Sequence, residues 1–351
     1  MKFQPTRCPC KSPECDSSPS FQYQRRGRFR RACDGREVQR FQCKRCKRTF
    51  STQTFRVDYR LRQPALERRV FSSLISKVTQ RQAARDLHCS RGLVARRNKT
   101  YGMHCRAFHE QMIFERGSSL SWSGCFLLDE LETYEHNRRL KPLTVPVLVH
   151  KPSYCILYAT VGKLPPRRPL SKANLRKLAA LERAEGTRRS ESRTKVAECF
   201  DVLEAITQKS GAVAVRTDEK HTYRALLQER FGERLLHSRT NSKVRRTFRN
   251  PLFAVNHTFA MLRDGLSRLV RRTWAGSKER EKLEWHLWIY AAWRNYVRPI
   301  TNARPNETAA MVAGLAPRML EVSELLQWKV PARSPHNERS QNPSRPPRAV
   351  P

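Results

Sequence analysis

Short runs of apolar residues in the middle of the chain are typical of buried strands. They cover residues 124–130, 143–150, 154–162 and 212–218, and the first three follow one another closely enough to form a meander. A helix is expected near 196–209, between the third run and the fourth. The pattern therefore predicts a three-stranded meander and a fourth strand that follows a helix.

Residues 66–101 change to a helical period. Their first apolar stripe consists of Val70, Leu74, Ile75 and Val78. Thr79 is expected to cap a short second helix and Ser90 a third, with a turn at 88–90 between the two. Basic residues then follow on the last helix: Arg91, Arg96, Arg97 and Lys99. This pattern predicts a helix-turn-helix whose second helix enters the major groove of DNA, and the alternative is a trihelical packing unit with a solvated basic face.

Two further helices are expected toward the C-terminal end. The first has one apolar stripe: Val255, Phe259, Leu262, Leu266 and Leu269. Three basic residues off this stripe are assigned to DNA binding: Arg263, Arg271 and Arg272. The second helix, 285–297, has aromatic residues at helical spacing, which favours core packing over base stacking. Residues 163–194 are expected to form a loop with a short helix, and the tail from 331 lacks the apolar content to fold.

Eleven cysteines occur in the chain, and six of them lie within the first 46 residues. The start of the chain lacks the apolar core of a signal peptide, so the thiols are expected to stay reduced and to favour metal over disulfides. We assign a structural zinc site to Cys10, Cys15, Cys43 and Cys46, in a zinc ribbon whose strands are FQYQRRGRFRR and VQRFQC. Cys8 competes with Cys10 as the ligand, Cys33 is a spare, and free cysteines in a disordered basic arm are the alternative.

The charge balance points to a polyanionic partner. The 351 residues include 70 Lys and Arg against 31 Asp and Glu, a formal net charge of +39. Nucleic acid fits best, because many Lys and Arg contacts release the counterions condensed on a phosphate backbone. An anionic membrane surface is the competing interpretation, but no stretch of the sequence approaches a transmembrane span.

Two of the expected strands end in an aspartate. The strand at 124–130 delivers Asp129, and the strand at 212–218 delivers Asp218. Neighbouring strand ends can bring two carboxylates to the same divalent ions, as in two-metal phosphoryl-transfer sites. The alternative is that both are solvated aspartates beside loops.

The order of these features resembles bacterial insertion-sequence transposases of the DDE superfamily, which have an RNase H-like catalytic core. The resemblance rests on the ribbon that runs into FSTQTF, on LLDELETY and TDEKHTY, and on RLVRRTWAGSK, which is similar to the basic helix after the third catalytic residue. It implies a multidomain protein with a zinc ribbon, an all-α helix-turn-helix domain and an α/β RNase H-like core with a mixed sheet. The expected boundaries are 1–56 for the ribbon, 57–118 for the helix-turn-helix domain, 119–300 for the catalytic domain with its basic insertion 163–194, 301–330 for a C-terminal helical segment and 331–351 for a disordered tail.

The resemblance also implies DNA strand cleavage and transfer, with two Mg²⁺ ions that activate the nucleophile and stabilise the leaving 3′-oxygen. Asp129 and Asp218 correspond to the first two acidic ligands, and the place where the family usually has glutamate falls on Asn256. Three interpretations stay open: Asn256 is a working ligand, Asp264 supplies the missing carboxylate, or the site is degenerate. We favour the first, because Arg263 shares the helical face of Asn256 and suits a role in holding a terminal phosphate.

The leading hypothesis is a DNA transposase with structural Zn²⁺ and catalytic Mg²⁺. Its expected partner is double-stranded DNA, both the terminal inverted repeats of the element and the target. The resemblance implies a homo-oligomer on DNA, since two ends must be held together, and a place in the bacterial cytoplasm with the nucleoid. A non-catalytic DNA-binding regulator with a degenerate RNase H-like domain is the alternative, and a basic RNA-binding protein is the third.

Overall fold

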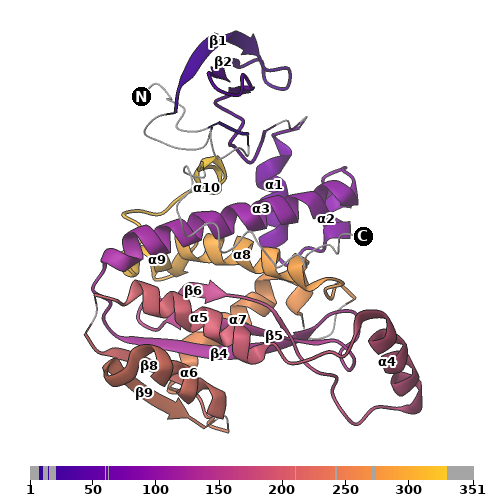
Figure 1. Ribbon diagram of the computed structural model, residues 1–351, viewed down its shortest axis with the longest axis vertical. Coiled ribbons are helices and arrows are strands. Elements are labelled where there is room, and N and C mark those ends of the chain that lie inside the picture. The colour runs from indigo at the N-terminus through magenta and orange to yellow at the C-terminus, as the bar shows by residue number, and fades with distance from the viewer. Residues whose placement is uncertain are drawn as a thin grey trace, which may run out of the picture. The chain divides into compact units, whose positions relative to one another are not determined.

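The computed structural model describes residues 8–10, 15, 21–59, 61, 63–209, 211–241, 243–270 and 274–329. The chain divides into two compact units (Figure 1). The described residues up to Glu67, with those from Leu326 on, form the cysteine unit, and Arg68–Leu325 form the sheet unit. Arg271, Arg272 and the expected tail 331–351 lie outside the described residues.

The cysteine unit is built on a three-stranded antiparallel sheet in the order β1-β2-β3. The two strands expected in this region are confirmed as β1 (Tyr23–Arg30) and β2 (Glu37–Cys43), and β3 (Thr49–Ser51) pairs with the other edge of β2. The register of β1 shifts around Gly27, whose φ of +57° is readily adopted only by a residue without a side chain. The sheet is small, so it depends on other groups to complete its core.

Three helices follow: α1 (Leu66–Ile75), α2 (Gln80–Asp86) and α3 (Arg91–Gln111). Both expected N-caps are confirmed. Thr79 accepts a hydrogen bond from a first-turn backbone N–H of α2 and completes a capping box, and Ser90 accepts one at the start of α3. The sequence therefore specifies where these two helices begin.

Helix α3 continues to Gln111, past the end of the helical pattern at residue 101, and packs along α8 (Arg280–Tyr296). Gly102 allows the close approach of the two helices, because a Cβ there would lie 2.3 Å from the Cβ of Trp285. The side chain of Asn98 donates a hydrogen bond of 3.0 Å to the carbonyl oxygen of Lys282. One face of α3 is therefore committed to the interior of the sheet unit.

A mixed sheet forms the centre of the sheet unit, in the order β6-β5-β4-β8-β9 with β7 beside β5. β4, β5 and β6 form an antiparallel meander, whereas β8 runs parallel to both β4 and β9. The predicted α/β class with a mixed sheet is confirmed, and this strand order is consistent with an RNase H-like core. The strands are β4 (Cys125–Tyr134), β5 (Pro142–His150), β6 (Cys155–Ala159), β7 (Gly162–Lys163), β8 (Val213–Asp218) and β9 (Leu235–Thr240).

Helices and short segments complete the sheet unit (Figure 1). The basic insertion contains one helix, α4, which Figure 1 shows at the edge of the unit, and only Leu178 in it is buried. The remaining elements are η2 (Met112–Arg116), η3 (Gly117–Ser119), α4 (Lys172–Glu185), α5 (Ser192–Ile206), α6 (His221–Phe231), η4 (Gly232–Arg234), α7 (Phe253–Gly265), η5 (Ser267–Leu269), β10 (Pro299–Thr301), β11 (Arg304–Thr308), α9 (Ala309–Val312) and α10 (Val322–Gln327).

Two elements differ from the sequence expectation. The apolar stripe predicted to run to Leu269 is interrupted, since α7 ends at Gly265. A Cβ at Gly265 would lie 2.4 Å from a ring carbon of Tyr290. The carbonyl oxygen of Gly265 accepts a hydrogen bond from the backbone N–H of Lys77. The helix therefore ends where it meets its neighbours. The second difference is β9, an edge strand with little burial and no strong apolar alternation.

The core of the sheet unit is extensive. All nine residues of β5 are buried, and the largest fully buried side chains of this unit include Trp288, Tyr101, Tyr223 and Phe126. Apolar burial on this scale is the main source of stability in a domain of this size. Within the part of the chain that the structure describes, no helix has both the length and the apolar character needed to cross a membrane.

Candidate functional site

The two candidate aspartates lie on neighbouring parallel strands. β4 pairs with β8 at Cys125↔Ala214, Phe126↔Val215 and Leu127↔Arg216 (three aligned positions). Carrying the same register two residues further places Asp129 opposite Asp218. β4 itself continues to Tyr134 alongside β5, so Asp129 lies two residues beyond the last aligned β4–β8 pair and not, as expected, at the end of the strand.

The two carboxylates also interact electrostatically. Burial is the largest cause of a raised pKa of about 6 at Asp129; the backbone N–H of Glu130 opposes this shift, and the negative charge of Asp218 adds to it. Arg246 acts on Asp129 in the opposite sense to Asp218. A buried carboxylate beside a second one is unfavourable without a cation, so the pair forms a candidate divalent-metal site.

Each aspartate accepts one backbone hydrogen bond from a residue that follows it by one or two positions in the sequence. The N–H of Glu130 donates to Asp129 Oδ1 at 2.7 Å, and the N–H of Lys220 donates to Asp218 Oδ1 at 3.0 Å. Such bonds orient a carboxylate and leave its second oxygen for a ligand. The two aspartates are held in the same way, although they come from distant parts of the sequence.

The third candidate, Asn256, lies on the first turn of α7 with a half-buried side chain. α7 packs against β4 and β5, so the helix is adjacent to the strand that carries Asp129. Asp264 is placed differently: its side chain is 73% exposed and pairs with Lys77 at 3.7 Å. The structure thus brings Asp129 and Asp218 together, positions the helix of Asn256 against the same sheet, and gives Asp264 another partner.

Sequence reasoning missed Glu130, the residue after Asp129. Its side chain is buried and accepts four hydrogen bonds, two on each oxygen: from Thr144 Oγ1 (2.6 Å), Ser192 Oγ (2.8 Å), Lys220 Nζ (2.5 Å) and Tyr223 Oη (2.6 Å). Burial works against ionisation of Glu130, but the hydrogen bond from Lys220 leads a set of contacts that keep its pKa below the ordinary value. The alternation of side chains along a strand was the available signal, because it turns Glu130 away from Asp129.

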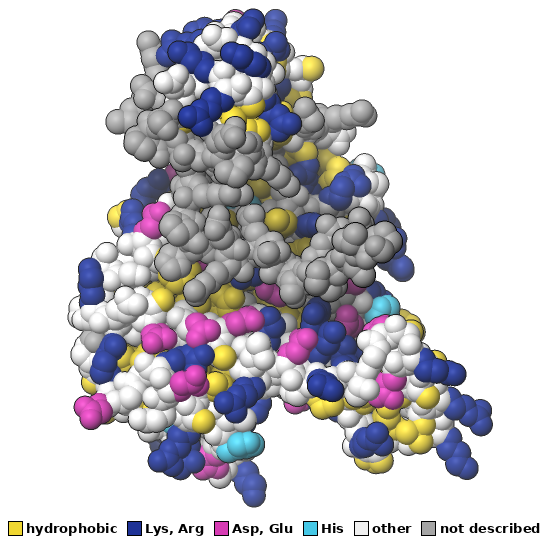
Figure 2. All heavy atoms as spheres, in the orientation of Figure 1, with side chains coloured by type: hydrophobic (Ala, Val, Ile, Leu, Met, Phe, Trp, Pro, Cys, Tyr) yellow, Lys and Arg dark blue, Asp and Glu magenta, His cyan; other side chains and the backbone are white. Residues whose placement is uncertain are grey.

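The basic residues assigned to the helix-turn-helix lie at the start of α3. Arg91, Arg96 and Lys99 are exposed, and Arg97 is half-buried. A shallow concavity between α2 and α3 has three arginines in its lining: Arg81, Arg85 and Arg91. Figure 2 shows Lys and Arg side chains over much of the visible face, with fewer Asp and Glu side chains between them. Arg91, Arg96 and Lys99 therefore lie on the surface of α3.

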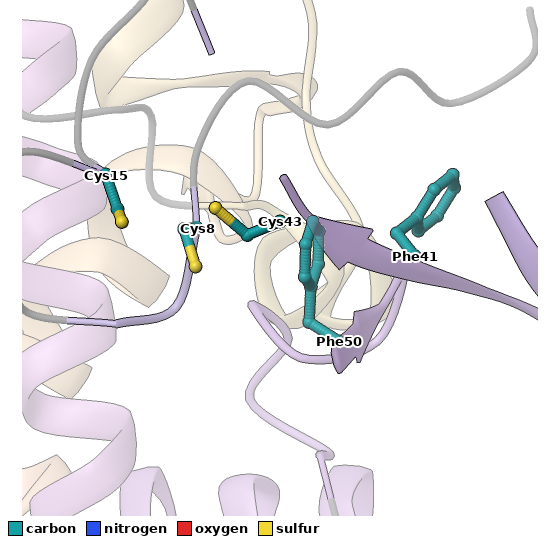
Figure 3. Packing of buried hydrophobic residues seen from close by; sticks show 5 residues of the cluster. All are labelled: Cys8, Cys15, Phe41, Cys43 and Phe50. Atoms are coloured by element: carbon teal, nitrogen blue, oxygen red, sulfur yellow. The ribbon is translucent and has the colours of Figure 1, made fainter. Parts of the chain in front are cut away.

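The cysteine unit gathers five thiols. The sulfur atoms of Cys8, Cys10 and Cys46 lie within 4.8 Å of one another, and so do those of Cys15, Cys43 and Cys46. Figure 3 shows Cys8, Cys15 and Cys43 near one another, with Phe50 next to Cys43 and Phe41 further away, and all five of these labelled residues are buried. Thiolates at such spacing suit zinc, so this cluster could hold a metal ion such as Zn²⁺.

The arrangement bears on the choice between Cys8 and Cys10. Cys8 is buried and its sulfur lies 3.5 Å from that of Cys46, whereas Cys10 is only partly buried. Burial raises the pKa of the Cys8 thiol, and a metal ion would offset this by replacing the proton. Cys33 is exposed beside Asp34, in the connection between β1 and β2, and lies outside both groups of cysteines.

Comparisons with known proteins add little to this geometry. No protein-family model and no curated protein sequence matches the chain. Among solved structures, the catalytic domain of Mos1 mariner transposase is similar over 57% of this chain and 86% of its own, at 15% sequence identity and a TM-score of 0.25. A likeness at that TM-score carries no argument about the site, which rests on its own residues.

Proposed function

We propose that this protein is a DNA transposase that cleaves and transfers DNA strands at a metal site of the D-D-N type. The observation that carries the proposal is the alignment of Asp129 with Asp218 on neighbouring parallel strands, together with the raised pKa of Asp129. Carboxylates with a perturbed pKa, such as Asp129, are concentrated at functional sites. Asn256 is the proposed third ligand, because its helix packs on the strand that carries Asp129.

The residues present fit Mg²⁺. Asp129 and Asp218 offer hard carboxylate oxygens, and Asn256 offers a neutral amide oxygen on α7. Bound there, divalent ions would supply Lewis acidity toward the scissile phosphate and its leaving 3′-oxygen. The chain's own contribution is to hold both carboxylates in place through the backbone N–H groups of Glu130 and Lys220.

Duplex DNA is the proposed partner. The net charge of +39 and the exposed Arg91, Arg96 and Lys99 at the start of α3 support binding to phosphates, and Arg263, on the same helix as Asn256, is a further proposed contact. Two ends of an element must be held in one complex during transfer, so we propose a homo-oligomer on DNA. Binding is expected to weaken steeply as the salt concentration rises.

The test is cleavage of labelled DNA that carries the flanking ends of the gene, with Mg²⁺ or Mn²⁺, by the unmodified protein and by the variants Asp129→Asn and Asp218→Ala. Each variant is expected to lose at least about 10³-fold in rate while it still binds the DNA. The matched control is Asp264→Asn, which removes an exposed acid from the helix of Asn256 and is expected to keep the rate. Equal rates for the unmodified protein and Asp218→Ala would overturn the proposal.

One observation favours a second function. Asn256 puts a neutral oxygen where an acidic third ligand is usual, which weakens the hold on a cation. A DNA-binding regulator with an inactive core would bind the same ends without cutting them. In that case the unmodified protein would bind the ends without cleaving them, whereas a working D-D-N site would cleave and would be impaired by Asn256→Ala.

A further inference from the structure

The side chains of Glu130 and Lys220 form an ion pair between two distant parts of the chain. Lys220 Nζ lies 2.5 Å from Glu130 Oε1 and also donates to Ser192 Oγ at 2.7 Å. The Glu130 side chain is 9% exposed and that of Lys220 is 35% exposed. A contact with one well-buried partner holds its geometry better than a surface pair does.

The same two residues also contact the candidate metal ligands through their backbones. The N–H of Glu130 donates to Asp129 Oδ1, and the N–H of Lys220 donates to Asp218 Oδ1. The ion pair therefore links the two peptide groups that orient the two carboxylates. β4 and β8 are hydrogen-bonded only as far as Leu127 and Arg216, so the ion pair adds a connection beyond the end of that pairing.

We propose that Glu130 and Lys220 are positioning residues, whose ion pair fixes the distance between Asp129 and Asp218 for binding of divalent cations. This inference rests on the proposed function, because it assigns a role within that same site. Neither residue is proposed as a ligand. Both oxygens of Glu130 are already occupied by donors, and alternation along β4 turns its side chain to the face opposite Asp129.

The network offers a way to separate positioning from stability. Tyr223 Oη donates to the same Oε1 atom of Glu130 as Lys220 does, but Tyr223 makes no backbone bond to Asp218 that the structure records. Tyr223→Phe thus removes one donor from Glu130 and leaves the link between the two aspartates intact. Lys220→Met removes the link and leaves Glu130 with three donors, so its carboxylate stays satisfied and the fold is expected to persist.

The experiment measures Mn²⁺ binding to the full-length protein by electron paramagnetic resonance, and the Mn²⁺ dependence of DNA cleavage. Lys220→Met is expected to raise the Mn²⁺ dissociation constant and the half-saturating concentration about 10-fold, as loss of a residue that orients a ligand typically does. The cleavage rate at saturating Mn²⁺ and the affinity for DNA are expected to change less than about 3-fold. Lys220→Arg is expected to recover part of the metal affinity, because it keeps the charge opposite Glu130.

Tyr223→Phe decides between the two roles. It is expected to lower the melting temperature and to leave Mn²⁺ affinity unchanged. Unchanged Mn²⁺ affinity in Lys220→Met, or an equal loss in Tyr223→Phe, would overturn the inference and leave the proposed function standing, provided that binding in the unmodified protein is abolished by Asp129→Asn. If the unmodified protein shows no Asp129-dependent Mn²⁺ binding, the proposed function and this inference both fail.

Discussion

The cysteine unit and the sheet unit differ in what stabilises the interior of each. The buried cluster of the cysteine unit has five members, of which three are Cys8, Cys15 and Cys43 and only two are aromatic. In the sheet unit a single strand, β5, is buried at all nine positions. Apolar burial is therefore enough to stabilise the sheet unit. The cysteine unit has thiols where a larger domain would have leucine, so its stability is expected to depend on a metal ion.

Metal removal should give the largest effect and should act on one unit only. Cys43→Ser, or treatment with a strong zinc chelator, is expected to unfold β1–β3, since structural zinc contributes on the order of 10 kcal/mol of folding free energy. Amide hydrogen exchange measured by mass spectrometry checks this, because protection should be lost in β1–β3 and kept in β4 and β5. Persistent protection of β2 in the chelated protein would show that the unit folds without metal.

A core truncation should reverse the pattern. Phe200 on α5 is fully buried, and Phe200→Ala is expected to lower the free energy of unfolding of the sheet unit by about 3–5 kcal/mol. Zinc content should not change. The control is Leu236→Ala, whose parent side chain is 59% exposed on β9 and whose effect should stay below about 0.5 kcal/mol. Urea unfolding measures both, and equal effects would contradict the account of the core.

Low pH should reduce the free energy of unfolding of the sheet unit through the buried side chain of His109. One ring nitrogen of His109 lies 3.0 Å from the hydroxyl of Tyr296 and the other lies 2.9 Å from the carbonyl oxygen of Leu157. Burial lowers the pKa of His109 to about 4, although the bond to that carbonyl opposes the shift. Because the folded pKa lies below the unfolded one, this stability is complete above about pH 6.5 and is lost as the pH falls toward 4.

At pH 5 the expected loss from His109 is about 2 kcal/mol relative to pH 7. Urea unfolding at the two pH values, for the unmodified protein and for His109→Gln, measures it. The variant is less stable overall, but its unfolding free energy should depend less on pH. The same pH dependence in both proteins would show that His109 does not titrate as proposed.

The smallest effect is expected from either of two single cysteine replacements. Zinc takes four ligands and the cluster has five thiols. The sulfur atoms of Cys8 and Cys10 both lie close to that of Cys46, so we expect either cysteine to serve as the fourth ligand. Cys8→Ser and Cys10→Ser are each expected to keep the metal and to lose about 1 kcal/mol or less, whereas the double variant should release it. Zinc content by mass spectrometry checks this. Release of zinc by one single variant would identify that cysteine as the required ligand.

The sequence predicts the elements whose signals are local. The Thr79 and Ser90 caps and the apolar runs of β5 and β8 depend on neighbours within a few positions, and the structure confirms these elements. The end of α7 at Gly265 is set by contact with Tyr290, which no local pattern contains. The edge strand β9 lacks burial and so lacks a signal.

The candidate site divides in the same way. Strand patterns indicate Asp129 and Asp218, but only pairing between strands aligns them. Glu130 was missed because its partners, Ser192, Lys220 and Tyr223, are distant in sequence. The spacing of the cysteines likewise allows more than one set of zinc ligands. The roles of Asn256 and the basic residues stay proposals. The described contacts place the helix of Asn256 against β4 and β5, but they do not include a contact of its side chain with either aspartate.

The alternation at Asp129 and Glu130 has a consequence for how this sequence can vary in length. These consecutive carboxylates serve opposite faces of β4, one toward the candidate cations and one toward the hydrogen-bonded network. Deletion or insertion of a single residue in 125–128 would exchange the two faces. We therefore expect substitutions of similar size to be tolerated there, and changes in length to be tolerated only in turns such as 135–141.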